Sequence, residues 1–415
     1  MSKKVIIIGG GIIGLSTAYY LQKEGHHVTV IDRANFSEGT SHINAGYITP
    51  SHIISLASPG MITKGIKWMF DAASPFYVKP RLDLDFLKWT LAFKRSATVK
   101  KVEKAIPVIK DINVLSRELY QEIKESKEFN FSYQHKGLLM YYQTDKAGAE
   151  EWKVGQRAIK EGLKVEHLSK EEVQEIEMNI DLNIKGAVYY HSDAHMTPNE
   201  FMPQLKAYLE KKEVAFFANE EVKSIDIKEG KVLSVSTNNQ ILKADEFVIA
   251  AGSWSQNFAK KLDIDIPIQA GKGYSINLKK ETNITIPAIL IEAKVAVTPM
   301  NGFTRLAGTM EIGGINHKIN PIRVNSIARA TENYYPNVKV NQQEKEHAKC
   351  GLRPCSPDGL PYIGKSSKCK NVTFATGHAM MGWSLGPATG KLVSEIISDK
   401  KTSLDLSPFH VDRKF

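Results

Sequence analysis

The stretch VIIIGGGIIGLSTAY at residues 5–19 decides how this chain folds. An apolar run typical of a buried strand ends on glycines and passes directly into a helical pattern. Gly9, Gly11 and Gly14 have the G-x-G-x-x-G spacing. In that motif the first glycine permits a tight turn, the second lets a pyrophosphate approach the backbone, and the third lets helix and strand pack closely. We therefore expect a nucleotide-binding βαβ unit with phosphates at the helix N-terminus.

The rest of the unit follows in the sequence. A second apolar run, residues 28–31, ends on Asp32, about 20 residues after the glycines. A carboxylate at this place binds ribose hydroxyls, which argues against a 2′-phosphate and hence against NADP. Arg33 beside it is the one feature that favours such a phosphate. The complete context favours a dinucleotide site over a chance glycine-rich turn, and it does not separate NAD from FAD.

Length and composition narrow the class of protein. The chain has 415 residues, of which 42% are hydrophobic, and this size suggests two domains. No apolar run approaches the roughly 18 residues of a membrane-spanning helix. The opening MSKK leads directly into the first strand without a signal peptide. We expect a cytoplasmic protein, or one resting on the inner face of the cytoplasmic membrane.

The cysteines and the charge argue against several other classes. Cys350, Cys355 and Cys369 are few and lack a metal-ligand spacing, which favours reduced free thiols and predicts no metal site. The formal net charge is +10, with lysines scattered in pairs. This pattern favours an ordinary solvated surface over attraction to anionic lipid, and either of these over nucleic-acid binding.

Helical and strand patterns alternate along the chain, as in an α/β protein. Residues 63–128 read as mostly helical. Ser169 with Glu172 is typical of a capping box. Thr197, Pro198 and Glu200 predict a stronger helix start, with an N-cap, a proline at the first helical position and a glutamate at the third. Neither an internal repeat nor a low-complexity linker separates two halves. We therefore expect two interleaved domains.

Two glycine-containing turns are candidates for further cofactor contacts. In ADEFVIAAGSWS, residues 244–255, an apolar strand ends at Gly252, which is either an ordinary turn or a second strand end facing the dinucleotide. In residues 374–397 a strand ends in Gly377, and a helix with Pro387 in its first turn follows. The partial positive charge of that helix N-terminus would stabilise the anion of a reduced flavin.

A third constellation is GLRPCSPDGLPYIG at residues 351–364. Arg353 lies among glycines and prolines, which form rigid turns. A guanidinium is the best single group for holding a carboxylate through two hydrogen bonds. On its own, an arginine in a loop is more often a surface or salt-bridge residue.

Together these stretches resemble the D-amino-acid oxidase superfamily, and most closely bacterial FAD-dependent D-amino-acid dehydrogenases of the small-subunit type. The resemblance covers nearly the whole chain, because six motifs occur in the expected order: TSHINAGYITP (40–50), GIKWM (65–69), GKGYS (271–275), LAGTMEIGG (306–314), GLRPCSPDGLPYIG (351–364) and TGHAMMGW (376–383).

The resemblance implies a Rossmann-like FAD-binding domain interleaved with a mixed-sheet substrate-binding domain. It assigns residues 1–62, 190–262 and 352–415 to the first domain, and residues 63–189 and 263–351 to the second. It also implies a set of FAD-binding residues: Gly9, Gly11, Ile12, Ile13, Gly14, Asp32, Arg33, Ser41, Asn44, Ala45, Gly46, Val222, Ala251, Gly252, Trp254, Gly377, His378, Met381, Gly382, Trp383, Ser384 and Leu385.

Substrate contacts and the mode of flavin attachment are likewise implied by the resemblance. Arg353 matches the arginine that binds the substrate carboxylate, and Tyr274 is a second candidate for substrate contact, the alternative being a packed strand tyrosine. Sarcosine-oxidase relatives attach the flavin to a cysteine near the position of GLRP in this chain. The aligned residue here is Gly351, and Cys350 is one residue away. We therefore expect non-covalent FAD.

The reaction implied is oxidative deamination of a D-amino acid to a 2-oxo acid and ammonia, by hydride transfer from Cα to flavin N(5). Electrons would pass to a membrane quinone chain, as in dehydrogenase relatives, or to oxygen, as in oxidases. A glycine or sarcosine oxidase and a D-hydroxyproline dehydrogenase are the nearest alternatives. A flavin-dependent RNA-modification enzyme and a redox-silent FAD-binding protein are more distant ones. The oligomeric state is left open.

Overall fold

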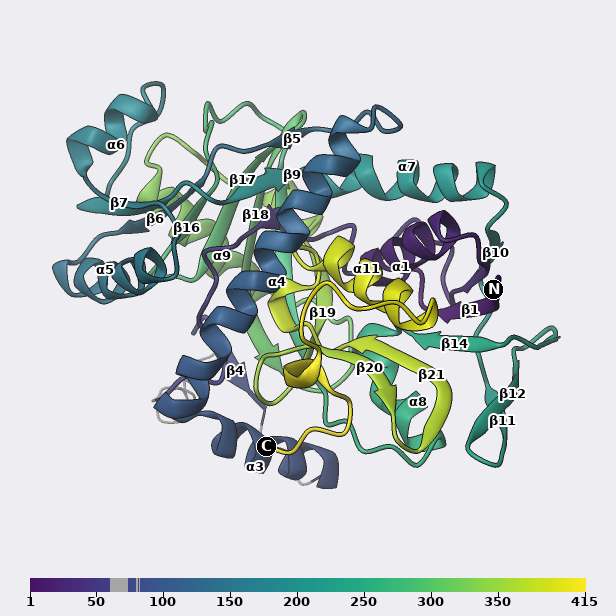
Figure 1. Ribbon diagram of the computed structural model, residues 1–415. Helices are drawn as coiled ribbons and strands as arrows, with labels where there is room; N and C mark the ends of the chain where they lie inside the picture. The colour runs from purple at the N-terminus through teal and green to yellow at the C-terminus, as the bar shows by residue number, and fades with distance from the viewer. Residues whose placement is uncertain (60–73, 80, 82) are drawn as a thin grey trace.

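Two sheets form the framework of the protein, described here from a computed structural model that covers residues 1–59, 74–79, 81 and 83–415 (Figure 1). The first sheet has six strands, and its neighbours are parallel except at one edge, where β20 runs antiparallel to β21. Its order is β10 (Ala215–Phe217), β2 (His27–Ile31), β1 (Lys4–Ile8), β14 (Glu246–Ile249), β21 (Cys369–Thr376) and β20 (Tyr362–Ser366).

The expected βαβ unit lies at the centre of this sheet. Helix α1 (Ile12–Lys23) begins directly after the glycines and connects the parallel neighbours β1 and β2. It packs beside α11 (Gly386–Ile397) in one core cluster, in which Leu15 and Leu392 are fully buried. On the opposite face, Ile6 and Phe374 join a second cluster with α8 (Ser255–Lys261) and the small sheet of β11 (Ser224–Lys228), β12 (Lys231–Ser236) and β13 (Ile241–Leu242).

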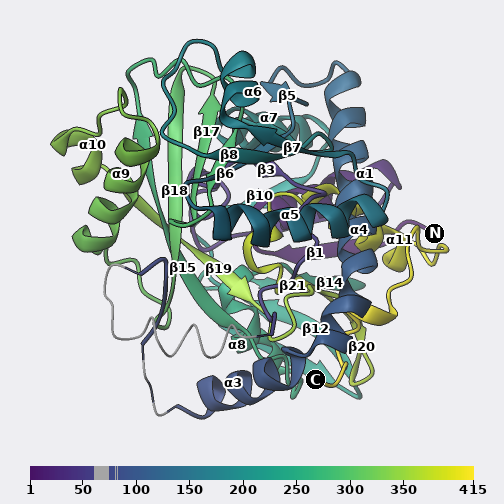
Figure 2. The same ribbon diagram turned by 90° about the vertical axis from the view of Figure 1, so that its left-hand side faces the viewer.

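The second sheet has nine strands. Along its main path the order is β19 (Lys349–Cys355), β15 (Gln269–Leu278), β18 (Phe303–Ile312), β17 (Val295–Met300), β16 (Ala288–Leu290), β6 (Leu138–Tyr142), β8 (Gly186–Tyr190) and β7 (Val165–Ser169), and β4 (Phe76–Val78) pairs with β18. Helix α9 (Pro321–Tyr334) packs on one face through Val324 and Ile327. Helix α5 (Asp145–Lys160) packs against β8 near the far edge of the sheet, as Figure 2 shows from the side.

Long helices and a short sheet connect the two frameworks. Helix α4 (Val99–Glu125) crosses the molecule diagonally in Figure 1, and the Tyr120 hydroxyl donates to the Trp383 carbonyl at 2.7 Å. The remaining elements of the described chain are β3 (Tyr47–Ile48), α3 (Leu84–Ser96), β5 (Tyr133–Gln134), α6 (Lys170–Ile176), β9 (Ala194–Met196), α7 (Pro198–Lys211) and α10 (Gln342–Glu346), besides short 3-10 turns. No described helix is long and apolar enough to cross a membrane.

The structure confirms the α/β class and most of the predicted elements. The capping box of Ser169 and Glu172 is formed at the start of α6. Helix α7 also begins where predicted, with Thr197 as the N-cap residue and Pro198 in the first turn. The Thr197 side chain does not cap the helix, because its Oγ1 accepts from the Asn301 amide at 3.0 Å, and Glu200 accepts from the Ser132 amide at 2.7 Å. Both side chains therefore connect α7 to neighbouring segments.

The strands of the two frameworks alternate along the chain. Strands of the six-stranded sheet come from 1–62, 190–262 and 352–415. Those of the nine-stranded sheet come from 63–189 and 263–351, except that β8 extends to Tyr190 and β19 extends to Cys355. The exact domain limits stay a prediction. The GIKWM motif at 65–69 lies outside the described residues.

Candidate active site

A cavity of about 1630 Å³ lies between the two sheets. On one side it is lined by the residues that follow β1, β2 and β14, namely Gly9–Gly11, Asp32–Ala34 and Ala250–Ser253. The carboxyl ends of parallel strands form the usual ligand crevice of open α/β sheets. On the other side it is lined by β15, β18 and β19 of the second sheet. Its volume exceeds the roughly 300–1,000 Å³ of a typical small-molecule pocket.

The N-terminus of α1 opens into this cavity. Gly11 is the N-cap, makes no side-chain cap, and no acidic residue occupies the first turn. The Ile12 amide donates to Ser41 Oγ at 3.0 Å, and Gly14 has no room for a Cβ, which would overlap the Gly9 carbonyl oxygen. The helix therefore has a positive end without a negative side chain of its own, and this arrangement fits a pyrophosphate.

Asp32 and Arg33 form the adjoining wall. The Asp32 carboxylate accepts from the Gly10 amide at 2.6 Å and from the Ala34 amide at 2.8 Å, so it fixes the glycine turn. The Arg33 guanidinium lies 3.6 Å from the ring centroid of Trp254, whose ring stacks in turn on His317. These residues, together with Val222, line the end of the cavity that the resemblance assigns to the ADP half of FAD.

The segment from His42 to Gly46 is held by Arg305, a residue that the sequence reasoning missed. Arg305 Nη1 donates to the carbonyls of His42 and Asn44 at 3.0 and 2.7 Å. Its Nε and Nη2 donate to Asn277 and Asn199, both at 2.9 Å. Burial lowers the Arg305 pKa to about 10. Arg305 is fully buried. It directly precedes the LAGTMEIGG motif, and this position was the only feature of the sequence that could have pointed to its role in the site.

The turn before α11 forms another wall. His378 Nε2 lies 3.0 Å from Thr389 Oγ1, and burial lowers the His378 pKa to about 3, so this imidazole is neutral. Ser384 Oγ donates to Asn113 Oδ1 at 2.7 Å and accepts from the Thr49 amide at 3.0 Å. The first turn of α11 carries no acidic residue, and therefore its positive end is not neutralised by its own side chains.

Most of the predicted cofactor residues line this one cavity, although they come from distant parts of the sequence. Four of them do not line it: Gly14, Gly46, Gly377 and Leu385. They lie behind its wall. A Cβ at Gly46 would overlap the Met196 carbonyl, and one at Gly377 would press on the Tyr362 ring. The assignment of individual residues to FAD stays a prediction.

Arg353 lines the opposite side of the cavity, on β19. Its Nη1 donates to the Thr309 carbonyl at 2.7 Å, which uses one of five guanidinium N–H donors. Within the described part of the chain, no carboxylate lies within ion-pair distance of Arg353. Burial lowers its pKa, yet a guanidinium stays protonated. A partly buried cation without an acidic partner indicates a site for an anionic ligand.

Thr309, which holds Arg353, has an unusual backbone. Its φ of +61° lies in the left-handed region, and the register of β15 and β18 shifts at this point. The arrangement is a β-bulge in which glycine normally takes the left-handed position. A β-branched residue with this φ is strained, and such strain is concentrated at functional sites. Sequence patterns did not reveal this bulge.

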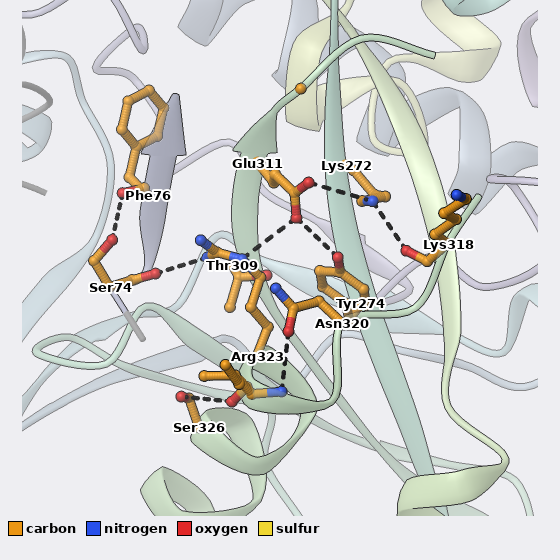
Figure 3. Close-up of polar contacts among 12 residues, drawn as sticks. Ser74, Phe76, Lys272, Tyr274, Thr309, Glu311, Lys318, Asn320, Arg323 and Ser326 are labelled. Carbon is orange, nitrogen blue, oxygen red and sulfur yellow. Dashed lines mark hydrogen bonds and ion pairs between the residues drawn. The ribbon is translucent and has the colours of Figure 1, made fainter. Parts of the chain in front are cut away.

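Tyr274 lies beside a buried charge network on the α9 side of the sheet (Figure 3). Its hydroxyl donates to Glu311 at 2.9 Å, and Glu311 pairs with Lys272 at 3.3 Å and Arg323 at 3.4 Å. Arg323 in turn donates to the Ser74 carbonyl at 2.9 Å. Tyr274 lines the cavity and is also packed in the α9 core, so the structure leaves both interpretations of its role in place.

Comparisons with known proteins agree with this geometry. Residues 4–396 match a family model described as FAD dependent oxidoreductase. D-amino acid dehydrogenase from Vibrio vulnificus is 30% identical over 97% of this chain and 99% of the relative. The enzyme of that name from Helicobacter pylori is 30% identical over 96% of each.

Solved structures show the same fold. Glycine oxidase from Geobacillus kaustophilus has a TM-score of 0.77 at 20% identity, covering 100% of this chain and 99% of that one. L-proline dehydrogenase from P. horikoshii has a TM-score of 0.75 at 21% identity, covering 99% and 97%. The family match spans almost the whole chain and includes both sheets that enclose the cavity. This chain therefore belongs to the DAO family of FAD-dependent oxidoreductases.

Proposed function

We propose that the protein is a D-amino acid dehydrogenase, which oxidises a D-amino acid to a 2-oxo acid and ammonia and passes the electrons to an acceptor other than oxygen. The names of its 30% identical relatives support this reading. The observation that carries it is Arg353, a partly buried cation in the cavity wall without a carboxylate partner among the described residues. An amino-acid carboxylate supplies that partner.

FAD fits the cavity because two helix N-termini face it without acidic residues and because glycines form its floor. When bound, FAD accepts the two electrons and the hydrogen that leave the substrate Cα. The chain's own residues have positioning roles. Arg353 binds the carboxylate and fixes the orientation of Cα, which can lower a barrier by several kcal/mol. The N-terminus of α11 stabilises negative charge at its end of the cavity.

We further propose that FAD is bound non-covalently. Cys350 is the cysteine nearest to the position used for attachment in relatives, and its Sγ donates to the His317 carbonyl at 3.3 Å. Burial raises the Cys350 pKa, which disfavours the reactive thiolate. Gly351 packs against Thr40 and Ile43 and offers no side chain to a flavin. Acid precipitation should therefore release all flavin into the supernatant, and flavin that stays in the pellet would contradict this.

A substrate panel tests the proposed function. The purified holoenzyme is assayed with D-amino acids, their L-isomers, glycine, sarcosine and D-hydroxyproline, with an artificial electron acceptor and separately with oxygen alone. We expect turnover of D-amino acids with the artificial acceptor and slow turnover with oxygen. Preference for glycine or sarcosine with rapid oxygen consumption would favour a glycine-oxidase-type enzyme, whose fold this chain shares. Oxidation of L-isomers alone would overturn the proposal.

A further inference from the structure

Strand β18 has a β-bulge opposite Gly273 of β15. Gly273 alone faces two residues of β18, Thr309 and Met310, because the register of the two strands shifts at this point. The Arg353 guanidinium occupies the space over Gly273, and its Nη1 donates to the Thr309 carbonyl at 2.7 Å. The shape of the bulge therefore decides where the guanidinium lies.

The bulge also brings the Glu311 side chain to the face of the sheet that α9 covers. Gly308 faces α9, because a Cβ on it would contact the Ile327 side chain. Residues three apart in a regular strand point to opposite faces, whereas the extra residue of the bulge returns Glu311 to the same face as Gly308. Lys272 and Tyr274, two apart on β15, share this face, and both contact Glu311 (Figure 3).

Glu311 connects the segments on both sides of Gly273. Its carboxylate lies 3.3 Å from Lys272 Nζ on one side and accepts from the Tyr274 hydroxyl at 2.9 Å on the other. Burial and the adjacent carboxylate raise the pKa of Tyr274, so its hydroxyl stays protonated and donates. Arg323 Nε of α9 lies 3.4 Å from the same carboxylate. One side chain thus joins β15, β18 and α9 at the bulge.

Stability alone does not account for this charge network. Lys272 is 3% exposed and Arg323 is 1% exposed, and in the described part of the chain Glu311 is the one carboxylate within ion-pair distance of either. Replacing a buried charge network by apolar side chains is often neutral or stabilising. A network kept at this position therefore indicates a role in shaping the site beside it.

We propose that Glu311 is a positioning residue for Arg353, and that it acts by fixing the bulge whose Thr309 carbonyl accepts from the guanidinium. The inference rests on the proposed function, in which Arg353 binds the substrate carboxylate. Thr309 is strained at a φ of +61°, and such a conformation persists only where its surroundings hold it. Without the contacts of Glu311 the bulge relaxes, and the guanidinium moves with the Thr309 carbonyl.

Binding of propionate to the holoenzyme tests this role, because propionate has the carboxylate of D-alanine without the amine that is oxidised. Calorimetric titration measures its Kd. For Glu311→Gln we expect the Kd to rise at least about tenfold, and the rate constant of flavin reduction by D-alanine to fall by a similar factor, since a displacement of about 1 Å can lower a rate by about 100-fold. FAD content should be unchanged.

The sign of the effect separates positioning from simple electrostatics. Removing the Glu311 charge leaves Lys272 and Arg323 unpaired, and this added positive charge would by itself strengthen the binding of an anion. Positioning predicts weaker binding instead. A propionate Kd that is unchanged or lower in Glu311→Gln would therefore overturn the proposal, as would a failure of propionate to bind the unaltered protein.

A second variant serves if Glu311→Gln does not fold with its two unpaired cations. Glu311→Asp keeps the charge, but its side chain is one methylene shorter and cannot reach Lys272, Arg323 and Tyr274 together. We expect its propionate Kd to rise by about threefold or more, the effect of one lost hydrogen bond. A Kd equal to that of the unaltered protein would overturn the proposal.

Glu246→Gln is the matched control. Glu246 is also buried beside two lysines, with Lys365 Nζ at 2.7 Å and Lys3 Nζ at 4.0 Å, but it lies on β14 of the other sheet. This variant should lower thermal stability and leave the propionate Kd unchanged. Equal weakening of propionate binding by Glu246→Gln and Glu311→Gln would indicate a general loosening of the fold, contrary to the proposal.

Coupling to Arg353 completes the test. In an Arg353→Ala background, Glu311→Gln should change the propionate Kd little, because the group that it positions is absent. The same factor in both backgrounds would overturn the proposal. Failure of the proposed function is seen separately, as a lack of flavin reduction by any D-amino acid in the unaltered protein, whereas propionate binding requires no turnover.

Discussion

The guanidinium of Arg353 lies directly over the α-carbon of Gly273 on the neighbouring strand. A Cβ at Gly273 would overlap Nη1, Nη2 and Cζ of Arg353. The two strands β15 and β19 are antiparallel neighbours, and Gly273 pairs with Gly351 in their register. Because Gly273 has no side chain, the guanidinium of Arg353, the proposed carboxylate-binding group, has the space that it occupies.

This relationship predicts a large effect from a small substitution. Gly273→Ala should displace the Arg353 guanidinium and lower kcat/KM for a D-amino acid by at least about 30-fold, equivalent to about 2 kcal/mol. Flavin content should stay unchanged, because Gly273 lies on the side of the cavity opposite the glycine turn. Steady-state kinetics and the flavin absorbance per protein measure both quantities.

A double-mutant cycle provides the control for that prediction. In an Arg353→Ala background, Gly273→Ala should lower kcat/KM little further, since the group that it displaces is already absent. If Gly273→Ala lowered kcat/KM by the same factor in both backgrounds, the two residues would act independently, contrary to the structure.

Thr309 gives a prediction about stability. Its φ of +61° costs an ordinary residue about 1–2 kcal/mol, whereas glycine adopts it freely. Thr309→Gly should therefore change the free energy of unfolding by less than about 1 kcal/mol. Thr304→Gly, on the same strand, should cost more, because Thr304 Oγ1 is hydrogen-bonded to Thr282 at 2.7 Å. Urea unfolding measures the free energy of unfolding of both variants. An equal loss in the two would contradict backbone strain at Thr309.

Arg305 predicts an effect on cofactor affinity. Arg305→Lys cannot reproduce four hydrogen bonds directed from one planar group, so the segment from His42 to Gly46 should loosen. We expect the Kd for FAD to rise by about tenfold or more, measured by fluorescence titration of the apoprotein. The matched variant Arg329→Lys alters an exposed arginine and should leave the Kd unchanged. Unaltered FAD affinity in Arg305→Lys would remove Arg305 from the cofactor site.

Buried histidines predict loss of stability in acid. Burial lowers the pKa of His195 from 6.5 to about 4, and both ring nitrogens lack a hydrogen-bond partner among the described residues. Because the folded-state pKa lies below the unfolded one, its stabilisation is complete above pH 6.5 and is lost as the pH falls toward 4. His52 and His378 have lowered pKa values of about 4 and 3 for the same reason.

The variant His195→Gln tests that pH dependence. Each such histidine adds up to about 1.4 kcal/mol per pH unit to the fall in unfolding free energy below pH 6.5. His195→Gln should remove one such contribution, so its stability curve should be shallower between pH 6.5 and 4. An identical slope in both proteins, measured by urea unfolding at several pH values, would show that His195 is not buried in neutral form.

The sequence was most informative where function depends on local backbone. The glycine spacing at residues 5–19 predicted β1, α1 and β2, because a tight turn and a close helix–strand contact impose residue types on one short segment. The capping box at Ser169 is of the same local kind. The turns after residues 250 and 376 were candidates for further cofactor contacts from their strand-to-helix pattern, and the family resemblance then assigned individual residues in them to FAD.

The relationships that shape the Arg353 side of the cavity were beyond reach of the sequence. Gly273 and Arg353 lie 80 positions apart in the chain, and only the pairing of β15 with β19 brings them together. The bulge at Thr309 carries threonine where glycine is usual, so no composition signal marks it. Thr197 and Glu200 matched the start of a helix, yet their side chains accept hydrogen bonds from distant segments and do not cap it. Tertiary contacts decided each of these cases.

Anaerobic mixing of the holoenzyme with D-alanine tests the central claim most directly, because reduction of the bound flavin bleaches its visible absorbance without any external acceptor. We predict rapid bleaching with D-alanine, none with L-alanine, and none with ethylamine, which lacks the carboxylate that Arg353 binds. Arg353→Ala, with equal flavin content, should be reduced at least about 100-fold more slowly, equivalent to about 3 kcal/mol. Bleaching by ethylamine at the rate of D-alanine, or equal rates in Arg353→Ala, would contradict the carboxylate-binding role of Arg353.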